Sequence, residues 1–408
     1  MSASATVSIN KMQYYQTTRQ QKIMHYQRPT TADINLDNFA FNIDQIRSKI
    51  SKNKKILIAV KANAYGHGMV EISRFAQDHL DIDTLGAALV SEGIVLREAG
   101  IDLPILVFGG LLETDIPYLF EHRLTPTLID FGMAEKISQF GQNNEKSIQV
   151  HINIDTGMGR IGVDHQSAFD IIKKIHQLPN INIEGLYTHF PSSDETDKEF
   201  THQQIDRFKE IIRDIKSEGI HIPLTHCFNS GAIIDLDDVD FNMVRPGIMI
   251  YGLYPSSEVD QGFALKQVMT LRSTIVFKKQ VQSGQTISYG RTYSPQKSTV
   301  IATVPIGYGD GFNRQFSNQG QVLVQGVRVP IVGRVTMDQI MIDLGDHPNL
   351  DSIQIGEEVV LYGPQGAQQI RINDIAEQLN TISYEVTCWI NDRVPRRFLY
   401  QGNQLYHK

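Results

Sequence analysis

The feature that most constrains the fold is a regular alternation between about Asp33 and Gly252. Short apolar runs such as "ILIAV", "ILVFGG", "IQVHINID" and "INIEGLYTHF" are separated by stretches with helical spacing. Strands that alternate with crossover helices form a parallel sheet. About eight such units close a (β/α)8 barrel, which takes roughly 250 residues. The sequence therefore predicts an α/β protein with an N-terminal (β/α)8 barrel of the TIM type.

The first helical stretch is "LDNFAFNIDQIRSKI". It places Phe39, Ile43, Ile46 and Ile50 on one stripe, and Asp37 is the predicted N-cap. After about Leu265 the pattern changes to short strands separated by Gly-containing turns, with one short helical pattern over 372–381. We predict a tail over 1–29, the barrel over 30–263 and a C-terminal, mostly β domain over 264–408.

Composition excludes several classes of function. The formal net charge of −7 gives no electrostatic support for binding nucleic acid or a membrane surface. Only two cysteines occur, Cys227 and Cys388, which are too few for a disulfide framework. No apolar run approaches ~20 residues, and the N-terminal segment lacks the apolar centre of a signal peptide. We predict a cytoplasmic protein without a metal site.

Polar residues follow the ends of several predicted strands. The carboxyl ends of barrel strands are where active sites lie in this fold. Taken singly, each residue has an ordinary explanation, such as a solvated loop lysine, a hydrogen-bonded core histidine or a helix cap. Their common position at one face of the barrel indicates a site. These polar residues are Lys61, Tyr65, Asn153, Arg160, His189, Asn229, Ser230 and Arg245, and Arg245 is followed by Gly247 and Ile248.

The chemistry of this set points to an aldehyde cofactor. Lys61 leaves an apolar strand and enters a pocket, where desolvation favours its neutral, nucleophilic form. A neutral lysine condenses with pyridoxal phosphate (PLP), and the hydroxyls of Tyr65 and Ser230 supply donors for its phosphate. Arg245 cannot accept a proton. An arginine at the pyridine nitrogen would keep the ring a weak electron sink, which suits a reaction that returns a proton and avoids transamination.

Nine motifs, in order along the chain, resemble those of bacterial alanine racemases. They are "VKANAYGHG", "DTGMGRIG", "THF", "NSGA", "VRPGIMIYG", "ISYGRTY", "IGYGDG", "GRVTMDQ" and "ISYEV". The resemblance begins at about Arg28 and covers nearly all of the remaining chain. It implies a PLP-dependent racemase that interconverts L- and D-alanine. It also implies a barrel with a β domain, assembled as a head-to-tail homodimer with shared active sites.

The resemblance also assigns roles to individual residues. Lys61 would hold the cofactor and act as the base for the D-amino acid, and Tyr289 of the other subunit would be the opposite base. Racemisation needs two such groups, because one removes the proton and the other delivers it. Arg160 and the backbone of Met337 would bind the substrate carboxylate, and Arg160 and His189 would lie next to Tyr289. The cofactor phosphate would be bound, beside Asn229, by Tyr65, Ser230, Gly247, Ile248 and Tyr384. Tyr308 and Tyr384 would line the substrate channel.

One position departs from the family pattern. Many members have a carbamylated lysine two residues before the Asp of "DTGMGR", and its negative charge orients the arginine. This chain has Asn153 there, which cannot be carbamylated. Our hypothesis is that a bound anion such as chloride, held by Asn153 and Arg160, replaces that charge. Racemases for serine or for a broader range of amino acids can also carry Asn at this position.

Three alternatives stay open from the sequence. The first is a serine or broad-specificity racemase with the same mechanism. The second is a PLP decarboxylase of the same fold class, for which Cys388 would be the catalytic acid, although Arg245 argues against it. The third is a non-catalytic PLP-homeostasis protein, which resembles the barrel alone. The sequence also does not distinguish supply of D-alanine for the cell wall from its use as a nutrient.

Overall fold

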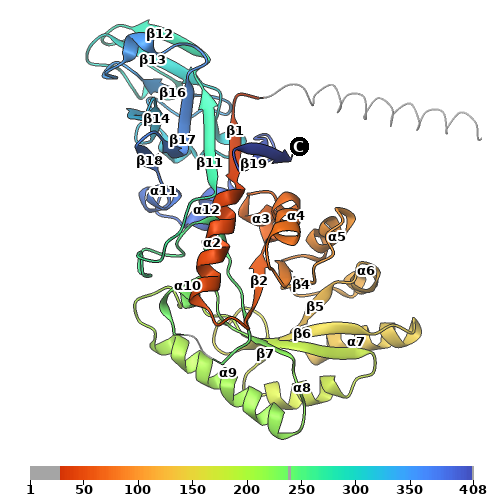
Figure 1. The fold of residues 1–408 in the computed structure, drawn as a ribbon. Coiled ribbons are helices and arrows are strands. Elements are labelled where there is room, and N and C mark those ends of the chain that lie inside the picture. The colour runs from red at the N-terminus through yellow and green to blue at the C-terminus, as the bar shows by residue number, and fades with distance from the viewer. Residues whose placement is uncertain (1–27, 238–239, 407–408) are drawn as a thin grey trace, which may run out of the picture.

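The computed structural model describes residues 28–237 and 240–406, and it consists of a barrel and a second, mostly β domain. Figure 1 shows the two parts end to end, with helix α2 (Leu36–Lys49) running from the β domain toward the barrel. The N-terminal tail predicted over 1–29 lies almost wholly outside the described residues.

The predicted barrel is confirmed. Eight parallel strands pair in one order, and the pairing of the fourth strand with the fifth closes the ring. In spatial order the strands are β2 (Lys55–Ala59), β3 (Thr84–Ala87), β4 (Ile105–Val107), β5 (Thr125–Leu128), β6 (Ile148–Asp155), β8 (Ile181–Tyr187), β9 (Leu224–His226) and β10 (Met243–Val244), with β7 (Val163–Asp164) attached to β6.

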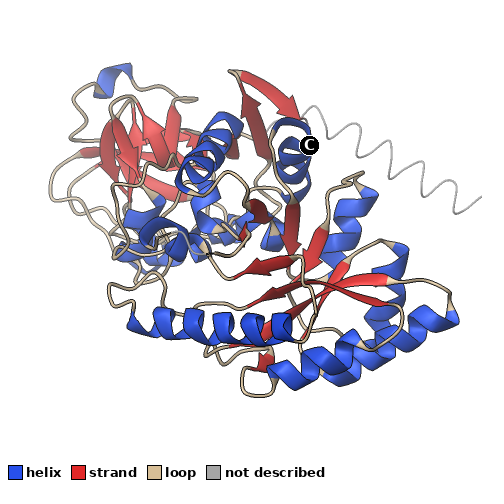
Figure 2. Cartoon of the chain, turned by 60° about the horizontal axis from the view of Figure 1, so that its bottom comes forward, coloured by secondary structure: helices blue, strands red, loops and turns tan. Residues whose placement is uncertain are grey.

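Helical segments follow the barrel strands, and the longer ones pack around the outer side of the barrel (Figure 2). They are α3 (Lys61–Tyr65), α4 (Met69–His79), α5 (Val90–Glu98), α6 (Ile116–Glu121), α7 (Phe131–Asn143), α8 (Ala168–His176), α9 (Glu199–Ser217) and α10 (Ser230–Asp235). In α2 the predicted stripe of Phe39, Ile43 and Ile46 is buried. The predicted cap is wrong by two residues: the side chain of Asn35, not Asp37, accepts the hydrogen bond from the N–H of Asn38.

The barrel interior is filled by side chains from several strands. Leu57, Leu106, Tyr187, Leu224 and Met243 form one buried cluster inside the ring. Such a layer makes the barrel a packed core rather than a pore. The strands therefore form a rigid frame, and their carboxyl ends hold the loops in fixed positions.

The second domain is mostly β, as its strand pattern predicts, and it contains two sheets. The larger sheet has the order β15 (Val327–Pro330), β14 (Gln321–Val324), β17 (Glu358–Gln365), β11 (Met269–Thr274), β1 (Thr31–Asn35), β19 (Arg396–Tyr400) and β20 (Asn403–Tyr406), with β18 (Gln368–Ile370) on β17. The smaller sheet has the order β12 (Phe277–Val281), β13 (Thr299–Val304) and β16 (Ile340–Asp343).

Strand β1 corrects the domain assignment at the N-terminus. The range predicted for the barrel begins at residue 30, yet Thr31–Asn35 pairs with β11 and β19 of the second domain. Asp33 on this strand is buried and accepts two hydrogen bonds of 2.6 Å from Arg397 of β19. A charge-assisted, bidentate pair of this kind is strong, so it ties the start of the chain to its end.

The helix predicted over 372–381 is α11 (Ile372–Gln378), and a further helix, α12 (Ser383–Cys388), follows it. Helix α12 packs against α3, at the carboxyl end of the first barrel strand. It thereby brings one segment of the second domain to the mouth of the barrel. Within the described residues, no helix is long and apolar enough to cross a membrane.

Candidate active site

A cavity of about 290 Å³ lies at the carboxyl ends of the barrel strands and brings together eleven of the predicted site residues. Ten of them come from the loops and ends of β2, β6, β8, β9 and β10, and one comes from α12. They are Lys61, Tyr65, Asn153, Arg160, His189, Asn229, Ser230, Arg245, Gly247, Ile248 and Tyr384. The geometry of the fold, in which parallel strands end at one face, accounts for their meeting.

The segment that carries Lys61 has an unusual backbone. After Lys61 the chain makes a left-handed turn, with φ near +50° at Ala62, Asn63, Ala64 and Tyr65. This conformation costs roughly 1–2 kcal/mol per non-glycine residue, so the four residues together cost roughly 4–8 kcal/mol. Gly66 follows the turn; its φ of +83° favours glycine, and a Cβ there would lie 2.2 Å from the carbonyl oxygen of Thr387.

Lys61 lies in a cationic, partly desolvated environment. Burial lowers the pKa of its amine, and the charges of Arg160 and Arg245 lower it further. Its Nζ lies 6.0 Å from the centroid of the Phe108 ring. None of the described residues that line the cavity is a carboxylate. The cavity therefore favours both a neutral, nucleophilic lysine and an anionic ligand.

Arg245 is buried and held in one orientation. One guanidinium nitrogen donates to the carbonyl oxygen of Thr188 at 2.7 Å, and the other donates to Nδ1 of His226 at 2.8 Å. The guanidinium also lies 5.0 Å from the centroid of the Tyr187 ring. Burial lowers the pKa of Arg245 to about 10, which leaves it a cation at neutral pH. Arg245 therefore presents a fixed positive charge to the cavity.

A chain of hydrogen bonds extends from Arg245 to Glu184. Nδ1 of His151 lies 2.9 Å from Nε2 of His226, and Nε2 of His151 lies 3.3 Å from the Glu184 carboxylate. Arginine only donates and a carboxylate only accepts, so each histidine carries its proton on Nε2. Burial lowers the pKa of both histidines, which keeps them neutral. The chain thus fixes both tautomers and the position of the guanidinium.

A small group of hydrogen-bond donors lines the same cavity as Lys61. The buried hydroxyl of Ser230 accepts the backbone N–H of Gly247 at 2.9 Å, and the same hydroxyl has its own proton to donate. The hydroxyl of Tyr65 lies beside Gly247, where an added Cβ would be 2.9 Å from it. Burial raises the pKa of Tyr65, so its phenol stays protonated and able to donate. Glycine at 247 therefore lets the backbone approach this hydroxyl closely.

Asn153 is buried at the side of the cavity near Arg160. Its side-chain amide donates one hydrogen bond of 3.2 Å to the carbonyl oxygen of Ile161. An amide has two N–H donors, so a second one is available for a neighbouring acceptor. No negative charge is supplied at this position by the side chain itself.

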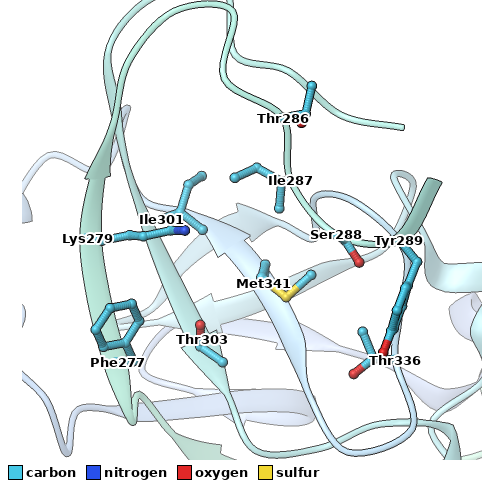
Figure 3. A pocket seen from close by; sticks show the side chains of 10 residues that line it. All are labelled: Phe277, Lys279, Thr286, Ile287, Ser288, Tyr289, Ile301, Thr303, Thr336 and Met341. Carbon is cyan, nitrogen blue, oxygen red and sulfur yellow. The ribbon is translucent and has the colours of Figure 1, made fainter. Parts of the chain in front are cut away.

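Three predicted residues lie apart from this cavity, on the second domain. Tyr289 lines a different cavity, of about 440 Å³, and its ring lies beside Thr336 (Figure 3). The N–H of Tyr308 donates to the carbonyl oxygen of Thr336, and the carbonyl oxygen of Met337 accepts from Gly309. Tyr289, Tyr308 and Met337 are 72%, 44% and 52% exposed. The three form one open surface rather than part of the Lys61 cavity in the same chain.

Sequence reasoning missed Phe108, Tyr187, Ile161 and Ala59 in the cavity lining. Phe108 and Tyr187 stand at strand ends in "ILVFGG" and "INIEGLY", the same signal that found Lys61, but aromatic residues there look like ordinary packing. Glu92 was also missed; its carboxylate accepts the N–H of Ala62 at 2.7 Å. Among the described residues, no cluster of His, Cys, Asp and Glu is arranged to hold a metal ion.

Comparison with known families agrees with this geometry. Residues 34–255 match the model of "Alanine racemase, N-terminal domain", and residues 268–398 match that of "Alanine racemase, C-terminal domain". The chain belongs to the alanine racemase family. The two matched regions correspond to the barrel and to the β domain.

Individual relatives are similar over almost their whole length. An alanine racemase of Halothermothrix orenii is 45% identical over 371 residues, which cover 91% of this chain and 97% of that protein. A solved alanine racemase of Clostridium difficile has a TM-score of 0.88 at 38% identity and covers 93% and 98% of the two chains. The alanine racemase of Bacillus anthracis with bound L-Ala-P has a TM-score of 0.86 at 36% identity, over 93% and 97%.

Proposed function

We propose that this protein is an isomerase that interconverts L- and D-alanine with PLP as its cofactor. The observation that carries the proposal is the cavity in which Lys61 meets two arginines and no lining carboxylate. The relatives described above are named alanine racemases, which supports alanine as the substrate. They do not favour a serine racemase, a decarboxylase or a PLP-homeostasis protein.

The residues present fit PLP. Lys61 would bind the aldehyde. The guanidinium of Arg245 is held in place by Thr188 and His226, and it would face the pyridine nitrogen. The donors around Ser230, Gly247 and Tyr65 would hold the phosphate, with Ile248, Asn229 and Tyr384 beside them. When bound, PLP supplies an electron sink that makes the α-proton of the amino acid acidic.

Two residues would move the proton. Lys61, once released from the cofactor, would exchange the α-proton on one face of the substrate, and Tyr289 would do so on the opposite face. His189 borders the same cavity, where burial lowers its pKa to about 3 and keeps it neutral. Arg160 would bind the substrate carboxylate because it is an exposed cation at the rim. Met337 would add a backbone contact, and Tyr308 would line the channel.

We further propose that the active sites are shared within a homodimer. Tyr289 would have to reach Lys61, yet in one chain the two residues line separate cavities. Exposed apolar side chains are typical of interfaces, and Phe277, Tyr289 and Met337 are each more than half exposed on this domain. A second copy that covers this surface would supply Tyr289, Tyr308 and Met337 to its neighbour. A cytoplasmic location stays a prediction from the cysteine content.

The position of Asn153 supports an anion site. We propose that chloride binds between the free N–H of Asn153 and the guanidinium of Arg160, in place of a carbamate. Both residues line the cavity, and Asn153 is buried. The anion would restrain Arg160 through its charge without a covalent modification.

A racemisation assay tests the proposed function. The purified protein is incubated with L-Ala, L-Ser or L-Lys, with and without added PLP, and the D-isomer is quantified by chiral chromatography. We expect D-alanine to form fastest, and only when PLP is bound. A protein that binds no PLP would refute the cofactor assignment, and faster turnover of serine or lysine would refute the substrate assignment.

A further inference from the structure

The left-handed turn at Ala62–Tyr65 joins two residues of the proposed cofactor site. Lys61 precedes the turn and Tyr65 ends it, and both side chains line the same cavity. Right-handed backbone would be the default for these residues, none of which is glycine. The placement of Lys61 relative to Tyr65 therefore depends on whatever holds the turn.

His67 holds the carboxyl end of this turn. Its Nδ1 lies 3.0 Å from the carbonyl oxygen of Ala64 and 3.0 Å from that of Tyr65. Two carbonyl oxygens only accept, so Nδ1 carries the proton and donates to both. The His67 ring is fully buried and stacks on Tyr251 with centroids 4.4 Å apart. The ring is thus a rigid clamp on two backbone carbonyls of the turn.

Tyr251 connects the clamp to the barrel. Its hydroxyl donates to the carbonyl oxygen of Ala59, the last residue of β2, at 2.8 Å. The turn is therefore fixed at both ends, by β2 through Tyr251 and by its own carbonyls through His67. Burial lowers the pKa of His67 to about 3, so the clamp stays neutral and unchanged across the neutral pH range.

We propose that His67 is a positioning residue of the cofactor site. Its Nδ1–H keeps the turn left-handed before PLP arrives, so that Lys61 and Tyr65 are pre-arranged for the aldehyde and the phosphate. This inference rests on the proposed function, because it concerns binding of PLP. If the clamp is lost, the turn is correct in only a fraction of the molecules, and the apparent affinity for PLP falls by that fraction.

A matched pair of variants separates the donor from the volume of the side chain. His67→Asn keeps an N–H close to the position of Nδ1. In His67→Leu the side chain has nearly the same shape as asparagine but has no donor. The PLP dissociation constant of each apoenzyme is measured from the fluorescence of Trp389, the one tryptophan of the chain. Borohydride reduction and mass spectrometry then give the fraction of Lys61 that carries PLP.

We expect the dissociation constant of His67→Leu to rise about tenfold, which corresponds to about 1.4 kcal/mol. His67→Asn should stay within about threefold of the parent, since one donor at this site remains. The two apoenzymes should melt at similar temperatures, because their side chains have the same number of heavy atoms and the same branching. His67→Phe, which keeps the stacked ring without the donor, should behave like His67→Leu and replaces it if the leucine variant does not fold.

Equal PLP affinity of the asparagine variant and of the donor-less variants would overturn the inference. So would a loss of apoenzyme stability in the donor-less variants without any change in PLP affinity. Failure of the proposed function has a different outcome, since the parent protein itself would then neither bind PLP on Lys61 nor racemise alanine.

Discussion

The close approach of Gly247 to Tyr65 gives a prediction that can be worked out in advance. In Gly247→Ala the new methyl group would lie 2.9 Å from the Tyr65 hydroxyl oxygen, while its next neighbours, Cζ of Tyr65 and Cβ of Ala59, would be 3.6 and 3.9 Å away. Only the first contact is shorter than an ordinary van der Waals distance. Overpacking of this kind costs about 1–3 kcal/mol of unfolding free energy.

The double variant isolates the contact. Tyr65→Phe removes the oxygen atom that the methyl group would meet, so Gly247→Ala should cost less in that background. We expect a coupling of about 1–2 kcal/mol between the two substitutions, measured by urea unfolding of the four apoenzymes. The affinity for PLP should fall in all three variants, because each one disturbs the proposed phosphate donors.

Additive costs would refute this reasoning. If the two substitutions combine within about 0.3 kcal/mol, the Tyr65 hydroxyl does not lie against residue 247. A Gly247→Ala variant with unchanged affinity for PLP would likewise remove this backbone from the proposed phosphate site.

Three further predictions concern single groups. Tyr289→Phe should lower the racemisation rate of alanine in both directions about 10²- to 10⁴-fold, as expected for loss of one acid–base group, and parental activity would contradict the two-base assignment. Because the pKa of His67 is lowered from 6.5 to about 3 in the folded protein, His67 stays unprotonated there, whereas in the unfolded chain it binds a proton below pH 6.5. As the pH drops from about 6 to 4, the unfolding free energy of the parent apoenzyme should therefore fall, relative to that of His67→Asn, by about 1.4 kcal/mol per pH unit. If urea unfolding instead gives the same difference between the two proteins at every pH, His67 titrates normally. If chloride binds beside Asn153, activity should decrease in chloride-free buffer, recover with chloride and ignore bicarbonate, and equal rates in all three buffers would exclude the anion site.

The barrel and most of its site could be predicted from the sequence for a geometrical reason. Parallel strands end at one face, so a polar residue at the end of an apolar run has a known location. Lys61, His189 and Arg245 follow this rule, and all three line the cavity. The β domain was predictable because short strands with glycine turns differ so clearly from the alternation before them.

Other features depend on contacts that no local pattern encodes. Strand β1 pairs with β11 and β19 because these are the neighbours that the folded chain offers, which its own five residues do not reveal. The left-handed turn occurs at two alanines, an asparagine and a tyrosine, whose default is right-handed, so only the surrounding contacts stabilise it. The chain of hydrogen bonds from Arg245 to Glu184 joins residues from four different strand regions, β10, β9, β6 and β8. Each of these features is decided by tertiary structure.

Mixing two inactive variants tests whether Lys61 and Tyr289 are the two bases and come from different subunits. Lys61→Ala and Tyr289→Phe are co-expressed with different tags, and the mixed dimers are purified and assayed for alanine racemisation. In a shared site, each mixed dimer has one site with both defects and one intact site. We therefore expect about half of the parental activity per mixed dimer. Mixed dimers as inactive as either variant alone would contradict it.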